Sequence, residues 1–267
     1  MFELTALGVR AGIRGQGFRI LVVVTLALLG AALLAGNFSG RQPLTVALDV
    51  GLSGMRFVLL MMVLVWVQDL FARDIERKTI YFVLAYPITR SSFVFSRFLA
   101  IALLAGAGVI VVGGALWLLL HFLGSEHPQI RPPALDMAYV LVLCGIWLDI
   151  LVIAAFAFLL ASFSTTPYLP LVLGFAFAIA ARGLGPTLDY LRQGERSDPL
   201  HASLFGPVLE HSFVWFPDLS RLDWRPLALY GLPIEPLSLA LAAVNAGAYI
   251  ILLMVLAALI FSRRNFT

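Results

Sequence analysis

Long runs of apolar residues, separated by short polar segments, dominate the pattern along this chain. A helix needs about 20 apolar residues to cross the roughly 30 Å hydrocarbon core of a bilayer, so runs of this length predict membrane spans. Six such runs occur, at residues 17–36, 50–68, 98–123, 137–163, 166–181 and 237–261. The pattern therefore predicts an all-α integral membrane protein with a single transmembrane domain over residues 1–267.

The composition supports this class of protein. Of the 267 residues, 61% are apolar and only 12% are charged, and the mean hydropathy is +0.97. Soluble domains are about a quarter charged, so this chain has too few polar residues to cover the surface of a soluble core. Its single cysteine, Cys144, excludes an intrachain disulfide. Nothing in the composition indicates a nucleic-acid partner.

The start of the chain has a different pattern, in which apolar and basic side chains lie on opposite helical faces. The apolar face carries Phe2, Ala6, Val9 and Ile13, and the basic face carries Arg10 and Arg14. A helix of this kind lies in the plane of the membrane interface. We therefore expect an interfacial helix over residues 1–16, with a frayed tail as the alternative.

Basic residues near the ends of the spans predict the orientation. Ten of them lie on one side of the membrane: Arg10, Arg14, Arg19, Arg73, Arg77, Lys78, Arg90, Arg97, Arg263 and Arg264. The short connections on the other side hold only Arg41 and Arg131. Because cytoplasmic loops carry the excess of lysine and arginine, both termini are predicted to be cytoplasmic. We expect a multi-pass protein of the bacterial inner (cytoplasmic) membrane.

Two longer segments lie outside the predicted spans. Residues 69–92 form a cytoplasmic segment that is polar at first and apolar later. Residues 182–236 form an external segment between the fifth and sixth spans, which is long for a simple connection. It mixes charged residues with apolar pieces, and the charges oppose full insertion into hydrocarbon. We therefore expect a partly embedded lid over the outer end of the bundle.

Two charged residues, Arg56 and Asp149, lie well inside the predicted spans. At 1.5 Å per residue, both lie about 18–21 Å from the inner boundary. An unpaired charge at the bilayer centre is unfavourable by about 2.5–3.5 kcal/mol, so equal depth predicts an intramembrane polar pair. A polar translocation path lined by one of them is the functional alternative. The simpler alternative is a purely structural role, in which the pair clamps two helices or Arg56 extends its side chain outward to the interface.

Motifs for catalysis are few. The chain has no G-x-x-x-x-G-K-[ST] sequence, so it lacks the phosphate-binding loop of P-loop ATPases. Gly51-Leu52-Ser53-Gly54 is similar to the Gly-x-Ser-Gly turn of rhomboid proteases, but a serine nucleophile needs a base within reach, and the last span has no histidine. A six-helix intramembrane serine protease using Ser53 is therefore the alternative function. We predict no catalytic residue and no metal site, since the spacing of His201 and His211 matches no ligand pattern.

Residues 74–90 join a charged patch to two apolar turns and end in Pro-Ile-Thr-Arg before the third span. This order resembles the signature of permeases of ABC exporters of the second type. The matching residues are Thr79, Leu84, Pro87, Ile88 and Arg90, and Lys78 stands in place of the usual glycine. Residues 216–222 and 261–264 resemble elements of the branch of that family associated with multicopper-enzyme maturation.

The resemblance implies the membrane subunit of a transporter rather than an enzyme. Two copies, or one copy and a related permease, would enclose a path for export and dock on two ABC ATP-binding subunits. Those subunits would bind ATP and Mg, this chain would bind no cofactor, and membrane lipid would be its other partner. The contact with the ATP-binding subunit is assigned to Asp74, Glu76, Arg77, Lys78, Thr79, Leu84, Pro87, Ile88 and Arg90. An ion-coupled carrier, which internal repeats would favour, is a further alternative, although the two halves show no obvious symmetry.

Overall fold

The computed structural model describes residues 2–76, 89–126, 129, 132–164, 166, 168–194 and 217–264. All regular secondary structure in these ranges is helical, without strands. Six helices are long and apolar enough to cross a membrane: Gly17–Phe38, Pro43–Ala72, Arg90–Gly124, Met137–Phe163, Leu169–Thr187 and Pro236–Arg263. The prediction of an all-α chain with six membrane spans is therefore confirmed.

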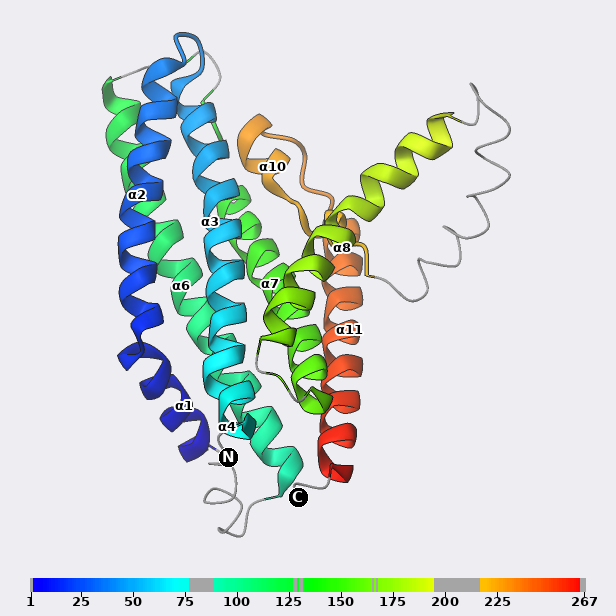
Figure 1. Cartoon of the computed structure of the whole chain (residues 1–267). Helices are drawn as coiled ribbons and strands as arrows, with labels where there is room; N and C mark the ends of the chain where they lie inside the picture. Colours follow the sequence, from blue (N-terminus) through cyan, green and yellow to red (C-terminus); the bar gives the residue numbers. More distant parts are fainter. Residues whose placement is uncertain are drawn as a thin grey trace.

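The long helices run side by side, and both chain termini lie at the same end of the bundle (Figure 1). We call this the terminal end, and the opposite end the far end. The helices are α1 (Phe2–Arg14), α2 (Gln16–Phe38), α3 (Pro43–Val67), the π-helix η1 (Gln68–Ala72), α4 (Arg73–Glu76), α6 (Arg90–Glu126), α7 (Met137–Phe163), α8 (Leu169–Gly194), the 3₁₀-helix η2 (Leu219–Leu222), α10 (Arg225–Tyr230) and α11 (Pro236–Arg263).

The helix α1 packs on α6 at the terminal end. The residues of α1 that are buried are Thr5, Gly8 and Gly12. The two glycines have no side chain, so the backbones of α1 and α6 can approach closely. Most of the apolar face predicted from the sequence is exposed, with Phe2 88% exposed and Ile13 47% exposed, although Val9 packs against the core. The amphipathic helix is therefore present, and small residues, together with Val9, hold it to the rest of the protein.

Three helices are longer than the apolar runs that predicted them. The differences are that α3 begins at Pro43 rather than residue 50, α6 at Arg90 rather than residue 98, and α8 continues past residue 181 to Gly194. Each extension contains charged residues, such as Asp49, Arg97 and Arg182. Charged residues end an apolar run, but they do not interrupt the backbone hydrogen bonds of a helix. The first part of the predicted external segment is therefore helical.

Side-chain caps and a proline set the course of the helices. The N–H of Ser92 donates to Thr89 Oγ1 at 3.3 Å, and the N–H of Ala138 donates to Asp136 Oδ1 at 3.1 Å. These bonds cap the start of α6 and the start of α7. Pro186 lies inside α8, and the helix turns away from the bundle near its end, as Figure 1 shows. Proline removes one backbone donor and kinks a helix in this way.

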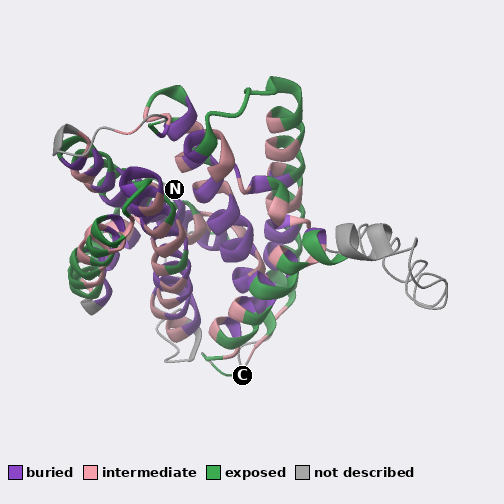
Figure 2. Cartoon of the chain, turned by 90° about the horizontal axis from the view of Figure 1, so that it is seen from above, coloured by how far each residue is buried: buried purple, intermediate pink, exposed green. Residues whose placement is uncertain are grey.

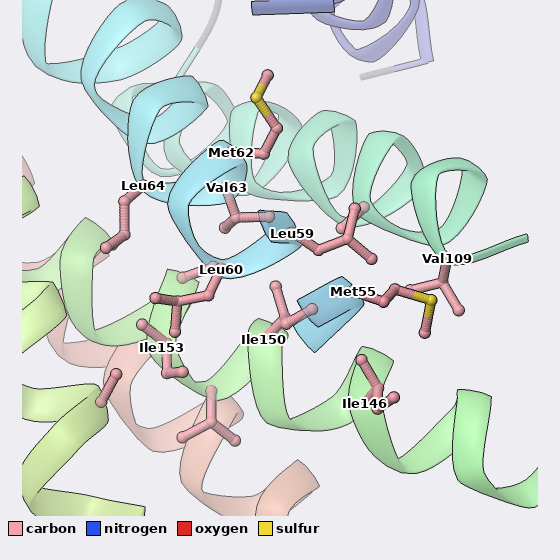
Figure 3. Close-up of a cluster of buried hydrophobic side chains, with 14 of the residues drawn as sticks. Met55, Leu59, Leu60, Met62, Val63, Leu64, Val109, Ile146, Ile150 and Ile153 are labelled. Atoms are coloured by element: carbon pink, nitrogen blue, oxygen red, sulfur yellow. The ribbon is translucent and has the colours of Figure 1, made fainter. Parts of the chain in front are cut away.

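The helix α3 forms the centre of the bundle, in contact with α2, α6, α7 and α8. Its side chains Met55, Leu59 and Leu60 lie beside Ile146 and Ile150 of α7 (Figure 3). Buried residues gather in the middle of the bundle and exposed ones on its rim (Figure 2). In the most apolar stretch of each span, 61% of residues are buried for α3 and α7 but only 17% for α2. The outer helices thus present apolar surface to lipid or to another subunit.

At the far end, η2 and α10 pack between α3, α7 and α8. Leu219, Leu222, Trp224 and Leu229 are buried there, so this part of the predicted external segment belongs to the core of the far end. The helix α10 ends at Tyr230 and is followed by Gly231, whose φ of 61° is in the left-handed region that favours glycine. Residues 195–216, which complete the predicted lid, lie outside the described residues.

Candidate functional site

An ion network lies in the far half of the bundle, and the buried carboxylate of Asp149 is its centre. Asp149, in α7, is 0% exposed. Its Oδ2 accepts a hydrogen bond from Arg56 Nε of α3 at 2.8 Å and another from Arg182 Nη2 of α8 at 2.5 Å. The structure thus brings together the two residues that equal depth had placed opposite each other. Because both bonds are charge-assisted, this one carboxylate joins α3, α7 and α8.

The network continues to the far end through Asp223 and Arg225. Arg225 donates through Nε to Asp223 Oδ1 at 2.7 Å and through Nη2 to Asp223 Oδ2 at 2.6 Å. Arg56 Nη1 lies 3.4 Å from the same Asp223 oxygen. Arg225 Nη1 reaches back to α3, 3.3 Å from Asp49 Oδ1 and in contact with Ser53 Oγ. The segment between η2 and α10 is therefore fastened to α3 by ionic bonds.

Three arginines and three aspartates make this network electrically neutral. Burial alone would raise the pKa of Asp223, but the hydrogen bond from Arg225 and the charges of Arg56 and Arg225 outweigh it and hold that pKa below its ordinary value. The bond to Asp223 likewise raises the pKa of Arg225, against the opposing effect of burial. Both groups therefore stay charged at neutral pH, and their ion pair persists there.

Four members of the network were not predicted as site residues: Asp49, Arg182, Asp223 and Arg225. One signal in the sequence could have found the first. Asp49, Ser53 and Arg56 are spaced by four and three residues, which puts them on one face of a helix. Arg182 was assigned to the external segment because the apolar run ends there. No comparable signal pairs Asp223 with a membrane residue.

The network also explains the Gly51-Leu52-Ser53-Gly54 sequence. In the described part of the chain, the hydrogen-bond partners of Ser53 are Asp49 and Arg225, and no histidine is among them. A Cβ atom at Gly51 would overlap Leu116, and one at Gly54 would overlap Leu28, so both glycines permit close helix packing. The comparison with rhomboid proteases therefore has no support from the geometry.

Three buried polar atoms of the network have no hydrogen-bond partner within the described ranges: Arg56 Nη2, Asp149 Oδ1 and Arg182 Nε. They surround the Asp149 carboxylate, where the arginines meet it. Unpaired polar atoms of this kind, buried in a membrane bundle, are where water or a polar solute gains most by binding. The geometry therefore allows both a structural clamp and a polar step on a path through the bundle.

Metal ligation has no evident place in the described residues. No group of three or more histidine, cysteine, aspartate and glutamate side chains gathers there. Among the described residues the histidine is His121, and its ring stacks on that of Trp117 with the ring centroids 5.5 Å apart. The other histidines, His127, His201 and His211, lie outside the described residues.

At the terminal end, four fully buried phenylalanines from four helical segments pack together. Phe71 of η1 lies 4.7 Å from Phe158 of α7, 5.6 Å from Phe261 of α11 and 5.9 Å from Phe93 of α6, measured between ring centroids. We call this the aromatic hub. Phe71 belongs to a π-helix, an irregular turn that often marks functional positions. The hub joins the terminal ends of α3, α6, α7 and α11.

Arginine side chains strengthen the same end by bonding helix C-termini. Arg90, at the start of α6, donates to the carbonyl oxygens of Ser262 at 3.0 Å and Arg264 at 2.9 Å. Arg264 in turn donates to the carbonyl oxygens of Ser162 at 3.1 Å and Ser164 at 2.8 Å, where α7 ends. Because the last carbonyls of a helix have no partner within it, these arginines tie α6 to α11 and α11 to α7.

Of the nine residues assigned to the ATPase contact, the side chains of two are described. Asp74 of α4 is 3.0 Å from Arg97 of α6, and Arg90 makes the bonds given above. Glu76 is described in its backbone only. The others lie outside the described residues: Arg77, Lys78, Thr79, Leu84, Pro87 and Ile88. The residues that flank this stretch in the sequence are thus bonded to long helices, Asp74 to α6 and Arg90 to the end of α11.

Comparison with known proteins gives the chain its family. Residues 45–184, just over half of the chain, match the family described as ABC-2 family transporter protein. No curated protein matches the chain at a significant level. The matched residues include most of α3 and the whole of α6 and α7, and with them Arg56, Asp149 and Arg182. The chain therefore belongs to the ABC-2 family of transporter proteins, as a multi-pass permease subunit of an ABC transporter.

Proposed function

We propose that this chain is the permease subunit of an ATP-driven exporter of the bacterial inner membrane, with both termini in the cytoplasm. It acts as a dimer, or pairs with a related permease, and two ABC ATP-binding subunits drive it. ATP and Mg bind to those subunits, and this chain binds no cofactor. The observation that carries the proposal is that Asp74 and Arg90, at the two ends of the stretch assigned to the ATPase contact, are both bonded to helices at the terminal end.

A segment that receives force from a soluble subunit must be attached rigidly to the helices that it moves. Here the attachment consists of the Asp74–Arg97 ion pair, the bonds of Arg90 to the end of α11, and the aromatic hub. Close-packed aromatic side chains transmit displacement because a protein interior is nearly incompressible. A push on residues 77–88 would therefore reach four membrane helices at once.

The ion network has a complementary role at the other end. It fastens α3, α7, α8 and the segment before α10 into one unit. We infer that these helices move together as the subunit changes state, with the unpaired atoms around Asp149 as a polar position within them. A lid formed by the external segment over the outer end of the path completes this proposal.

The exporter direction and the coupling role of residues 74–90 rest on the resemblance of that segment to exporter permeases. The narrower assignment, to the branch associated with multicopper-enzyme maturation, rests on residues 216–222 and 261–264. Among these, Asp218 caps η2 by accepting from the N–H of Ser220 at 3.0 Å, which is a structural role.

Native mass spectrometry of the chain, purified from its own host through an affinity tag, tests this assembly. The expected species contains two permease subunits and two ATP-binding subunits, and it hydrolyses ATP. A chain that is recovered only as an isolated monomer, under conditions that preserve other membrane complexes from the same host, would contradict the proposal.

A further inference from the structure

A cavity of about 380 Å³ opens between α1, α2 and α6, with Trp66 of α3 in its wall. Its lining on α2 extends from Phe18 to Leu29, a length of about 16 Å at 1.5 Å per residue. That is close to half of the roughly 30 Å bilayer core, which is the depth of one leaflet. Val22, Leu26 and Val111 in its walls are exposed, so the cavity opens on the lipid-facing surface. We call it the lateral slot.

Only two residues of the lateral slot carry polar side-chain atoms, Thr25 and Trp66. Thr25 is 8% exposed and Trp66 is 2% exposed. Neither Thr25 Oγ1 nor Trp66 Nε1 has a hydrogen-bond partner within the described part of the chain. A buried donor without an acceptor is unfavourable, so an occupant that supplies an acceptor oxygen to the indole N–H would be bound preferentially.

The depth of Trp66 identifies the kind of acceptor. A Cβ atom at Gly17, at the start of α2, would lie 3.5 Å from Trp66 Nε1. The indole therefore lies near the level where α1 meets α2, at the terminal end of the span. Indole rings at this level lie among lipid headgroups and the adjoining carbonyl groups. Thr25 lies about 12 Å deeper along α2, so its hydroxyl is too far from the headgroups to select among them.

Three basic residues lie on α1 and α2, the two helices that form the same end of the slot. Arg10, Arg14 and Arg19 each follow a slot residue in the sequence, and all three are exposed. They have no ion-pair partner among the side chains that the structure describes. Exposed arginines at a membrane surface attract anionic headgroups. The positive charge on this part of α1 and α2 therefore complements a phosphate at the membrane surface.

We propose that the lateral slot binds one acyl chain of an anionic glycerophospholipid from the leaflet on the side of the two termini. The chain fills the apolar slot, its ester carbonyl accepts a hydrogen bond from Trp66 Nε1, and its phosphate lies among Arg10, Arg14 and Arg19. Under the orientation proposed above this is the cytoplasmic leaflet. The lipid site itself does not depend on the proposed transport function.

Quenching of tryptophan fluorescence by brominated lipid tests this site. The purified chain is reconstituted in phosphatidylcholine vesicles that contain a minor fraction of phosphatidylglycerol with brominated acyl chains. The emission of Trp66 is obtained by subtracting the fluorescence of the Trp66→Phe variant from that of the wild-type chain. We expect brominated phosphatidylglycerol to quench Trp66 although its side chain is buried, and brominated phosphatidylcholine at the same fraction to quench it less.

Two substitutions on α6 separate binding in the slot from contact with bulk lipid. Ala107→Phe fills the slot and should remove most of the quenching of Trp66. The matched Ile110→Phe changes a residue that is 72% exposed and outside the slot, and should leave it unchanged. If Ala107→Phe loses helix content by circular dichroism, the smaller Ala107→Leu replaces it. Quenching that is absent, or that the filled slot does not reduce, would overturn the site.

A triple variant, Arg10→Gln/Arg14→Gln/Arg19→Gln, tests the preference for an anionic headgroup. It should remove the preference for phosphatidylglycerol while an acyl chain still fills the slot. Equal quenching by both brominated lipids in the wild-type chain would overturn the assignment of an anionic lipid.

Discussion

Replacing Asp149 with asparagine is expected to lower the free energy of unfolding by about 3–5 kcal/mol, the usual effect of breaking a buried ion pair from one side. The substitution leaves the charges of Arg56 and Arg182 without the carboxylate oxygen that both now share. Titration with SDS in mixed micelles, followed by circular dichroism, measures the change. The matched control is Asp69→Asn, which breaks the half-exposed Asp69–Arg73 pair and should change stability by less than about 1 kcal/mol.

Removing the three central charges together distinguishes an ionic role from loss of packing at position 149. The variant Arg56→Met/Asp149→Leu/Arg182→Met leaves Asp223 paired with Arg225. It should be close to the wild-type chain in stability, because apolar residues often replace a buried ionic group without loss. A triple variant less stable than Asp149→Asn would show that the network is not the reason for the effect. A simple exchange of Arg56 and Asp149 is a poorer test, since it would place an arginine beside Arg182.

The second large effect is expected for Leu84→Asp, in the segment assigned to the ATP-binding subunit. A carboxylate buried at an apolar contact loses its hydration without a partner. The variant should therefore lose most of its association with the ATP-binding subunit, or retain association with ATP hydrolysis no longer linked to transport. Both are measured on complexes purified through a tag on this chain. The matched control is Leu7→Asp, at an exposed position of α1 (57% exposed), which should leave association and hydrolysis intact.

A Leu84→Asp variant with normal association, normal hydrolysis and normal transport would contradict the coupling role of residues 74–90. A further substitution, Arg90→Gln, distinguishes docking from transmission. It removes the two bonds to the end of α11 without changing the apolar residues of that segment. We therefore expect docking to persist in Arg90→Gln while the linkage of hydrolysis to transport weakens.

The sequence was sufficient to predict the helical class and the number of spans, because both depend on local hydropathy and length. The residues at which the helices begin and end were harder to predict from the sequence. Asp49, Arg97 and Arg182 lowered the local hydropathy, and the helices that contain them continue because backbone hydrogen bonds are independent of side-chain charge. A charged residue at the end of an apolar run is therefore ambiguous between the end of a helix and a buried partner.

The polar pair within the membrane could be predicted from equal depth, but its wider network could not. Arg182 and Asp149 are 33 residues apart and Arg56 and Asp223 are farther still, so only the packing of α8 and α10 on α3 and α7 brings them together. The aromatic hub illustrates the same limit. Each of its phenylalanines looks like any other apolar residue of a span until the terminal ends of four helices converge on Phe71.

The central claim is that an ATP-binding subunit drives this permease through residues 74–90. Site-specific photocrosslinking tests it most directly, with p-benzoylphenylalanine in place of Leu84 and, as the matched control, in place of Gly40 in the α2–α3 connection at the far end. We expect the photoreactive group at position 84 to crosslink to the ATP-binding subunit and the one at position 40 not to do so. Crosslinks from position 84 to lipid alone, or crosslinks to the ATP-binding subunit from position 40, would contradict it.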